Sequence, residues 1–172
     1  MTASTGSRGR QPNAWRPSNG CGGSSVEAQP DFSELLALFN EERVEYLLIG
    51  AYALAHHGVV RSTGALDIWV RPTPENAESV LRALERFGFG DLDLSHDDFL
   101  HPDRVVQLGQ PPVRIDLMTS ISGVDWAKGC AGAEPSTYGT IPVHVLGLTD
   151  LVRNKRAAGR LKDLADLESL GQ

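Results

Sequence analysis

The run Tyr46-Leu47-Leu48-Ile49 is wholly apolar, and it constrains the fold more than any other segment of the chain. A strand that is apolar on both alternating faces is buried on both sides, so it must lie inside a sheet that helices cover. Gly50 ends the run, and the short segment 51–57 has helical character up to the stop at Gly58. This succession predicts an α/β (α+β) fold built on a covered sheet.

Helix and strand patterns alternate along the rest of the chain. A helix is expected from Asp31, where apolar residues follow at helical spacing, and Pro74 opens another that runs to Phe87. The other expected elements are strands at 66–70, 104–108, 113–118 and 141–145, the middle two forming a hairpin, and closing helices at about 148–157 and 160–170. The order predicts a mixed sheet with helices packed on it and a C-terminal helix pair.

Two finer expectations concern the C-terminal third. Pro142 cannot donate to a strand ladder, so its strand is expected at a sheet edge. Leu161, Leu164 and Leu167 give the last helix an apolar stripe.

Composition divides the 172 residues into two parts. Residues 1–29 are rich in Gly, Ser, Pro and Asn and are expected to form a disordered tail, while 30–172 are expected to form one domain. Three arginines and one glutamate give the tail a charge of +2, which leaves −8 of the total of −6 for the domain. An acidic body does not favour a broad nucleic-acid-binding surface.

The cellular location is predicted from features that the sequence lacks. No apolar run approaches the ~18 residues that cross a bilayer, and no apolar block follows the N-terminal arginines. Cys21 and Cys130 make no disulfide framework and are interpreted as reduced thiols. We therefore expect a cytoplasmic protein with no membrane partner.

Two aspartates interrupt otherwise apolar strands. Side-chain alternation places Asp67 opposite the apolar face of 66–70, and Asp116 opposite the apolar face of 113–118. If these strands are neighbours with matching faces, the carboxylates converge and repel each other unless a cation neutralises them. Mg²⁺ takes carboxylate oxygens together with substrate phosphates. Either acid alone fits a solvated strand end, but the two together favour a functional site.

The turn Gly50-Ala51 joins a strand to a helix. Free N–H groups at a helix start, beside small residues, let a phosphate approach the backbone. Many such turns need a glycine only for steric reasons, so the feature is weak by itself.

The adjacent residues His56 and His57 are not expected to bind one ion, because neighbouring helical side chains point about 100° apart. The remaining histidines, His96, His101 and His144, show no zinc spacing.

In combination, these motifs resemble the minimal nucleotidyltransferases of the DNA polymerase β superfamily. The matching positions are Gly50-Ala51, His57-Gly58, Arg61, Thr63, 67–70 and 114–117. The chain looks closest to the small bacterial type, similar to AbiEii and other toxin–antitoxin proteins, which carries a Lys-rich C-terminal helix pair. That element would be 154–166 here.

The resemblance implies a nucleotidyltransferase fold and transfer of a nucleoside monophosphate from an NTP to an acceptor hydroxyl. The acceptor in this family is an RNA or tRNA end, a protein or a small molecule, and an antitoxin can be a partner. The implied cofactor is Mg²⁺ or Mn²⁺.

The resemblance also assigns roles by position. Gly50 and Ala51 would hold the NTP phosphates, and Asp67 and Asp116 would be catalytic metal ligands. The implied nucleotide contacts are Arg61, Thr63, Lys155 and Asp163. The same residues also fit a plainer interpretation, in which the loop residues stiffen their loop and the helix pair is a solvated, ion-paired face.

One position departs from the family pattern. The first acid of an Asp-x-Asp pair should stand two residues before Asp67, and that position is Ala65, which has no ligand atom. An engineered inactive variant, a natural degenerate member and a shifted register all remain open. Activity is therefore expected to be impaired. A non-catalytic nucleotide-binding or partner-binding module, or a regulatory domain without a ligand, is the alternative.

Overall fold

The computed structural model describes residues 28–172. The first helix begins at Pro30, one residue before the predicted start at Asp31, and the proposed tail at 1–29 lies almost wholly outside the described residues. Within the described part, no helix has the length and apolar character needed to span a bilayer.

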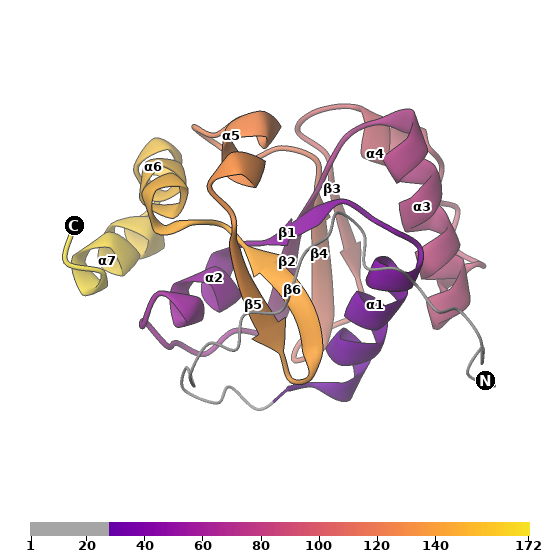
Figure 1. Cartoon of the computed structure of the whole chain (residues 1–172), viewed down its shortest axis with the longest axis horizontal. Coiled ribbons are helices and arrows are strands. Elements are labelled where there is room, and N and C mark those ends of the chain that lie inside the picture. The colour runs from indigo at the N-terminus through magenta and orange to yellow at the C-terminus, as the bar shows by residue number, and fades with distance from the viewer. Residues whose placement is uncertain (1–27) are drawn as a thin grey trace.

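One mixed sheet organises the described residues (Figure 1). Its strands are β1 (Tyr46–Leu48), β2 (Ala65–Val70), β3 (Val105–Leu108), β4 (Arg114–Met118), β5 (Glu134–Tyr138) and β6 (Ile141–Val145). Their order across the sheet is β3-β4-β2-β1-β6-β5. The neighbours β2 and β4, and also β1 and β6, run parallel, whereas the other pairs are antiparallel. The predicted mixed sheet and the predicted hairpin of β3 and β4 are confirmed.

Helices cover both faces of this sheet, which explains why β1 is apolar throughout. They are α1 (Pro30–Glu41), α2 (Gly50–His56), α3 (Pro74–Leu84), α4 (Asp97–Leu100), α5 (Trp126–Ala131), α6 (Leu148–Ala158) and α7 (Leu161–Ser169). A π-helical segment, Glu85–Phe89, continues α3. Figure 1 shows α1 and α3 on one side of the sheet and α2, α6 and α7 on the other.

The core lies between α1, α3 and the sheet. Phe32, Leu35 and Phe39 of α1 are buried in one hydrophobic cluster with Leu66 and Ile68, which form the apolar face of β2. Burying that face directs the alternate residues of β2 toward α2 and the helix pair, and those residues include Asp67.

The edge position predicted for the strand with Pro142 is wrong. β6 lies between β1 and β5, and the sequence pattern did not reveal β5. Proline is tolerated because β1 pairs with β6 only at Leu48 and Val145. Farther along β6, at Pro142, the edge of the strand that faces away from β5 lies against α1, and the Asn40 side-chain amide donates to the Pro142 carbonyl at 2.8 Å. The nitrogen and the carbonyl of one strand residue point to the same side, so the N–H that proline lacks would not have bonded to a neighbouring strand.

The apolar stripe predicted for the last helix is also wrong in part. Leu167 is buried, but Leu161 is 88% exposed and Leu164 is 50% exposed. The inward positions of α7 are instead filled by Asp163 and Asp166, which pair with a buried lysine. A charged cluster thus replaces apolar packing between α6 and α7.

Candidate functional site

The two predicted acids lie side by side on neighbouring strands. The parallel register of β2 and β4 places Asp67 directly opposite Asp116, with Leu66 beside Ile115 on the buried face. We call Asp67 and Asp116 the acid pair. The expected convergence follows from this register, since residues opposite each other in paired strands share a face.

The start of α2 closes one side of the acid pair. Gly50 has a φ of +63°, and a Cβ at this position would overlap Oδ2 of Asp67. The backbone N–H of Ile49 donates to the Asp67 carbonyl at 3.1 Å, which ties the end of β1 to the same residue. Glycine is therefore required here for both its backbone angle and its lack of a side chain.

The acid pair carries unbalanced negative charge. Burial first, and then the charge of Asp116 and a hydrogen bond with it, together raise the pKa of Asp67 to about 6, against smaller opposing effects of Lys162 and Arg114. Two adjacent carboxylates that resist joint ionisation have the electrostatics of a cation or proton-transfer site.

Arg114 also belongs to the site, although the sequence analysis assigned it no role. It lies opposite Ala65 in the strand register and two residues before Asp116, so its side chain shares their face. Its Nε lies 3.0 Å from Oδ1 of Asp116, and its Nη2 lies 3.0 Å from Oδ2. The sequence did contain a signal for this ion pair, because a basic residue two positions from an acid in a strand lies on the same face as that acid. This guanidinium partly neutralises Asp116 and would compete with a metal for its oxygens.

Ala65 occupies the expected position of a further carboxylate. It is 5% exposed, and its methyl group offers no ligand atom. The Thr63 hydroxyl accepts from the Ala65 amide at 3.2 Å and donates to its carbonyl at 2.9 Å. Thr63 therefore shapes the chain entering β2. Its role as a nucleotide contact stays a prediction.

Lys155 and Asp163 bind each other in a buried ionic cluster between α6 and α7. Nζ of Lys155 is 3.1 Å from Asp163 and 2.9 Å from Asp166, and Lys155 itself is 4% exposed. Arg160 adds a 2.7 Å contact to Asp163, and Arg61 a 3.3 Å contact to Asp166. We call these five residues the helix-pair network. The lysine, Asp163 and Arg61 bind one another here, and their nucleotide roles stay predictions.

Lys162 is the basic residue of the helix pair whose charge reaches the acid pair. It is exposed at the start of α7, and its charge lowers the pKa of Asp67 against the effect of burial. It stands next to Asp163 in sequence but points away from the helix-pair network, since adjacent helical residues diverge by about 100°.

The donor set of the acid pair fits one hard divalent cation. Asp67 and Asp116 supply carboxylate oxygens from adjacent strands, and Mg²⁺ completes its shell with waters and phosphate oxygens. Ala65 supplies nothing for a second ion.

The divergence expected of the two adjacent histidine side chains is not found in the structure. His56 and His57 bring ring nitrogens within 4.8 Å of each other and of a carboxylate oxygen of Glu134. The 100° separation does not hold there because α2 ends at His56 and His57 already leaves the helix.

Comparison with known proteins supports the fold. Neither a protein-family model nor a curated protein matches the chain. Among solved structures, a Thermotoga maritima protein described as "a putative nucleotidyltransferase" matches with a TM-score of 0.53 and 15% identity. The match covers 84% of this chain and 93% of that one. The described residues thus have the nucleotidyltransferase fold that the motifs predicted.

Proposed function

We propose that this chain binds a nucleoside triphosphate at the acid pair as a metal-dependent nucleotidyltransferase, with transfer impaired by Ala65. The observation that carries the proposal is the register match of Asp67 and Asp116 beside Gly50. The likeness to a solved structure of this fold adds support, since the acid pair stands in a sheet of the matching architecture.

The acid pair would hold Mg²⁺ or Mn²⁺, which when bound neutralises triphosphate charge and favours departure of pyrophosphate. Gly50 and Ala51 would hold phosphate oxygens at the start of α2, where Gly50 brings the backbone against the Asp67 carboxylate. Lys162 and Arg61 would supply positive charge from α7 and from the loop before β2.

The acceptor is proposed only by class. An NMP would pass to a hydroxyl of an RNA end, a protein or a small molecule. The charge of −8 carried by residues 30–172 disfavours a long RNA and favours the other two classes. A role beside an antitoxin partner is proposed on the resemblance of the motifs alone.

Nucleotide binding is tested by thermal unfolding of the full chain with Mg·ATP, and with ATP plus a chelator. Saturating ligand at 100 times its dissociation constant stabilises by about 2.7 kcal/mol, which is a measurable rise in melting temperature. The rise should need the metal, vanish in Asp67→Asn, and persist in Asp93→Asn, a matched change of an exposed aspartate. Absence of any shift with the four common NTPs would overturn the proposal.

Transfer is tested by restoring the missing carboxylate. Ala65→Asp should raise pyrophosphate release from Mg·NTP by about 10²-fold or more, because loss of one metal ligand has an effect of this size. Ala65→Asn is the matched control, since it adds similar volume without a charge. Failure of Ala65→Asp to raise turnover, with nucleotide binding intact, would leave only the binding role.

A non-catalytic nucleotide-binding module is the second candidate function. The bidentate contact of Arg114 with Asp116 favours it, because the guanidinium already occupies the oxygens that a metal would need. This candidate predicts a nucleotide-induced shift that survives the chelator, in contrast to the metal-dependent shift above.

A further inference from the structure

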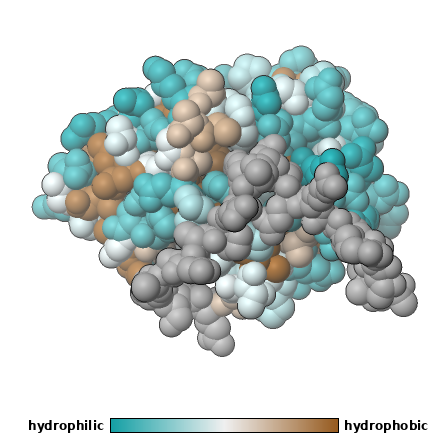
Figure 2. All heavy atoms as spheres, in the orientation of Figure 1, coloured by the Kyte–Doolittle hydropathy of each residue, from teal (hydrophilic) through white to brown (hydrophobic). Residues whose placement is uncertain are grey.

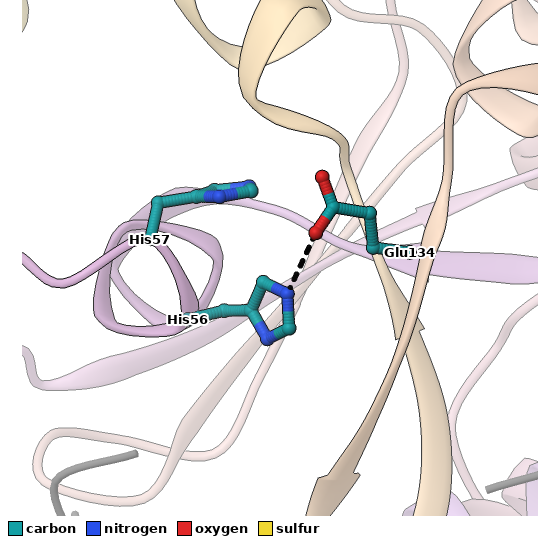
Figure 3. Close-up of side chains that lie close together, drawn as sticks. All are labelled: His56, His57 and Glu134. Carbon is teal, nitrogen blue, oxygen red and sulfur yellow. Dashed lines mark hydrogen bonds and ion pairs between the residues drawn. The ribbon is translucent and has the colours of Figure 1, made fainter. Parts of the chain in front are cut away.

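A second polar cluster lies at the opposite end of α2 from the acid pair (Figure 3). His56 is the last residue of α2, His57 follows it, and Glu134 is the first residue of β5. One ligand atom from each lies within 4.8 Å of the other two. The cluster therefore joins three potential metal ligands from segments far apart in the sequence.

Hydrogen bonds hold the His56 ring above β5. Its Nε2 lies 3.0 Å from Oε2 of Glu134, and its Nδ1 lies 3.2 Å from the Ser136 hydroxyl. Glu134 and Ser136 are two residues apart on one strand, so their side chains share a face. A carboxylate only accepts, so Nε2–H of His56 donates to Glu134 and Nδ1 accepts from the Ser136 hydroxyl. A metal ion bound between the ring and Glu134 would displace the Nε2 proton, and Nδ1–H would then donate to Ser136, an outer hydrogen bond that fixes the tautomer of a metal-bound imidazole.

The His57 ring is oriented independently. Its Nε2 lies 2.9 Å from the Leu146 carbonyl, at the end of β6 next to β5. The two imidazole rings stand 4.9 Å apart and nearly perpendicular, at 86°. Figure 3 shows both rings and the Glu134 carboxylate gathered around one point.

Two imidazoles and one carboxylate form the ligand set of three-ligand zinc sites, in which water takes the fourth position. Ligand atoms bonded at about 2.0 Å in a tetrahedron are about 3.3 Å apart, so the observed cluster needs only a modest closure around an ion. Two neutral imidazoles with one carboxylate carry a charge of −1, which suits a dication. Imidazole selects zinc and similar transition metals over Mg²⁺, which prefers the all-oxygen acid pair.

We infer that His56, His57 and Glu134 bind one zinc ion, with water as the fourth ligand. The ion clamps the C-terminal end of α2 to β5, while the N-terminal end of α2 contacts Asp67. This inference does not rest on the proposed function, because no residue of the acid pair takes part.

The test uses the untagged full-length chain, loaded with ZnSO₄ and then desalted. We expect about one zinc per chain by elemental analysis, and a tetrahedral visible absorption spectrum when Co²⁺ replaces zinc. His56→Ala and Glu134→Gln should each weaken zinc affinity at least about 10-fold, since each removes or neutralises one ligand. Circular dichroism verifies that these variants, changed at solvent-accessible positions, are folded.

Matched controls separate this site from others. His101→Ala removes an exposed imidazole paired loosely with Asp97 at 3.9 Å, and it should leave zinc binding unchanged. The double variant Cys21→Ser, Cys130→Ser should also retain zinc, which excludes thiolate ligation. The inference is overturned if the chain retains no zinc, if His56→Ala binds it as tightly as the unchanged chain, or if the cysteine variant loses it.

Discussion

The acid pair and the helix-pair network are both built around partly or fully buried aspartates, yet the two regions treat negative charge in opposite ways. Burial first, and then the neighbouring Asp116, together raise the pKa of Asp67 to about 6. Burial also acts on Asp163, but hydrogen bonds from Arg160 and Lys155 outweigh it and lower the pKa of that carboxyl.

The difference lies in the partners. In the helix-pair network three cations surround two carboxylates, so each carboxylate contacts two cations. In the acid pair, among the described residues, only Arg114 makes an ion-pair contact, and it binds Asp116 and not Asp67. Buried carboxylates paired with cations join helices, whereas a carboxylate without a cation beside it leaves a site that a ligand can complete. This contrast separates the aspartates that join two helices from the pair that we propose to bind a ligand.

Lys155→Met should have the largest effect on stability. It leaves Asp163 and Asp166 buried without their shared ammonium, and removing one partner of a buried ion pair costs about 3–5 kcal/mol. Urea unfolding measures the loss. Lys128→Met, at an exposed pair with Asp125, is the matched control and should change stability by less than about 1 kcal/mol. Equal losses in the two variants would contradict a structural role for the network.

Arg114→Leu should have the next largest effect, a loss of about 2 kcal/mol, because the buried Asp116 carboxyl loses its ion-pair partner. The same variant should gain more stability from Mg²⁺ than the unchanged chain does, since the guanidinium no longer competes for the Asp116 oxygens. Unfolding with and without Mg²⁺ measures both effects. A smaller Mg²⁺ effect in the variant would show that Arg114 does not oppose the metal.

Asp67→Asn should stabilise the chain by about 1 kcal/mol at pH 7, because it removes a carboxylate that resists ionisation. A carboxyl whose folded pKa lies above its unfolded value binds its proton more tightly in the folded state. The stability that the protonated Asp67 carboxyl contributes to the folded state is therefore fully present below about pH 4 and is lost as the pH rises through about 6. The gain from Asp67→Asn should accordingly shrink as unfolding is measured at lower pH, and a gain independent of pH would contradict this electrostatic origin.

Arg160→Ala should have the smallest effect, under about 1 kcal/mol at pH 7. Its guanidinium is 61% exposed, although it contacts Asp163 at 2.7 Å. The loss should decline in acid, since a lowered folded pKa stabilises above the unfolded value and that stabilisation is lost as Asp163 is protonated. Thermal unfolding in low and high salt measures it. A loss as large as that of Lys155→Met would mean that exposure does not distinguish the two cations.

Much of the fold could be predicted from local patterns. The helices opened by prolines at Pro30 and Pro74 and the apolar strand at β1 have signals within a few residues. β5 escaped prediction because its sequence, Glu-Pro-Ser-Thr-Tyr, lacks an apolar face. It forms by pairing with β6, and a strand stabilised by its neighbour carries little signal of its own.

The site was predicted less evenly. Side-chain alternation sufficed to place Asp67 and Asp116 on the strand faces opposite the apolar ones, but the partner of each charge depends on contacts across the fold. The pairing of Arg114 with Asp116 needed only a two-residue offset and could have been found. The meeting of His56 and Glu134, 78 positions apart, could not.

By itself, the sequence determined the alternation of helices and strands, the missing carboxylate at position 65 and the face on which each strand acid stands. These properties depend on near neighbours along the chain. Only the tertiary structure decided which charged side chains are paired with an opposite charge. The register of β2 against β4 and the contact of α6 with α7 set the distances between charged groups that are far apart in the sequence. Electrostatic energy depends on those distances and on burial, and both exist only once the core has formed.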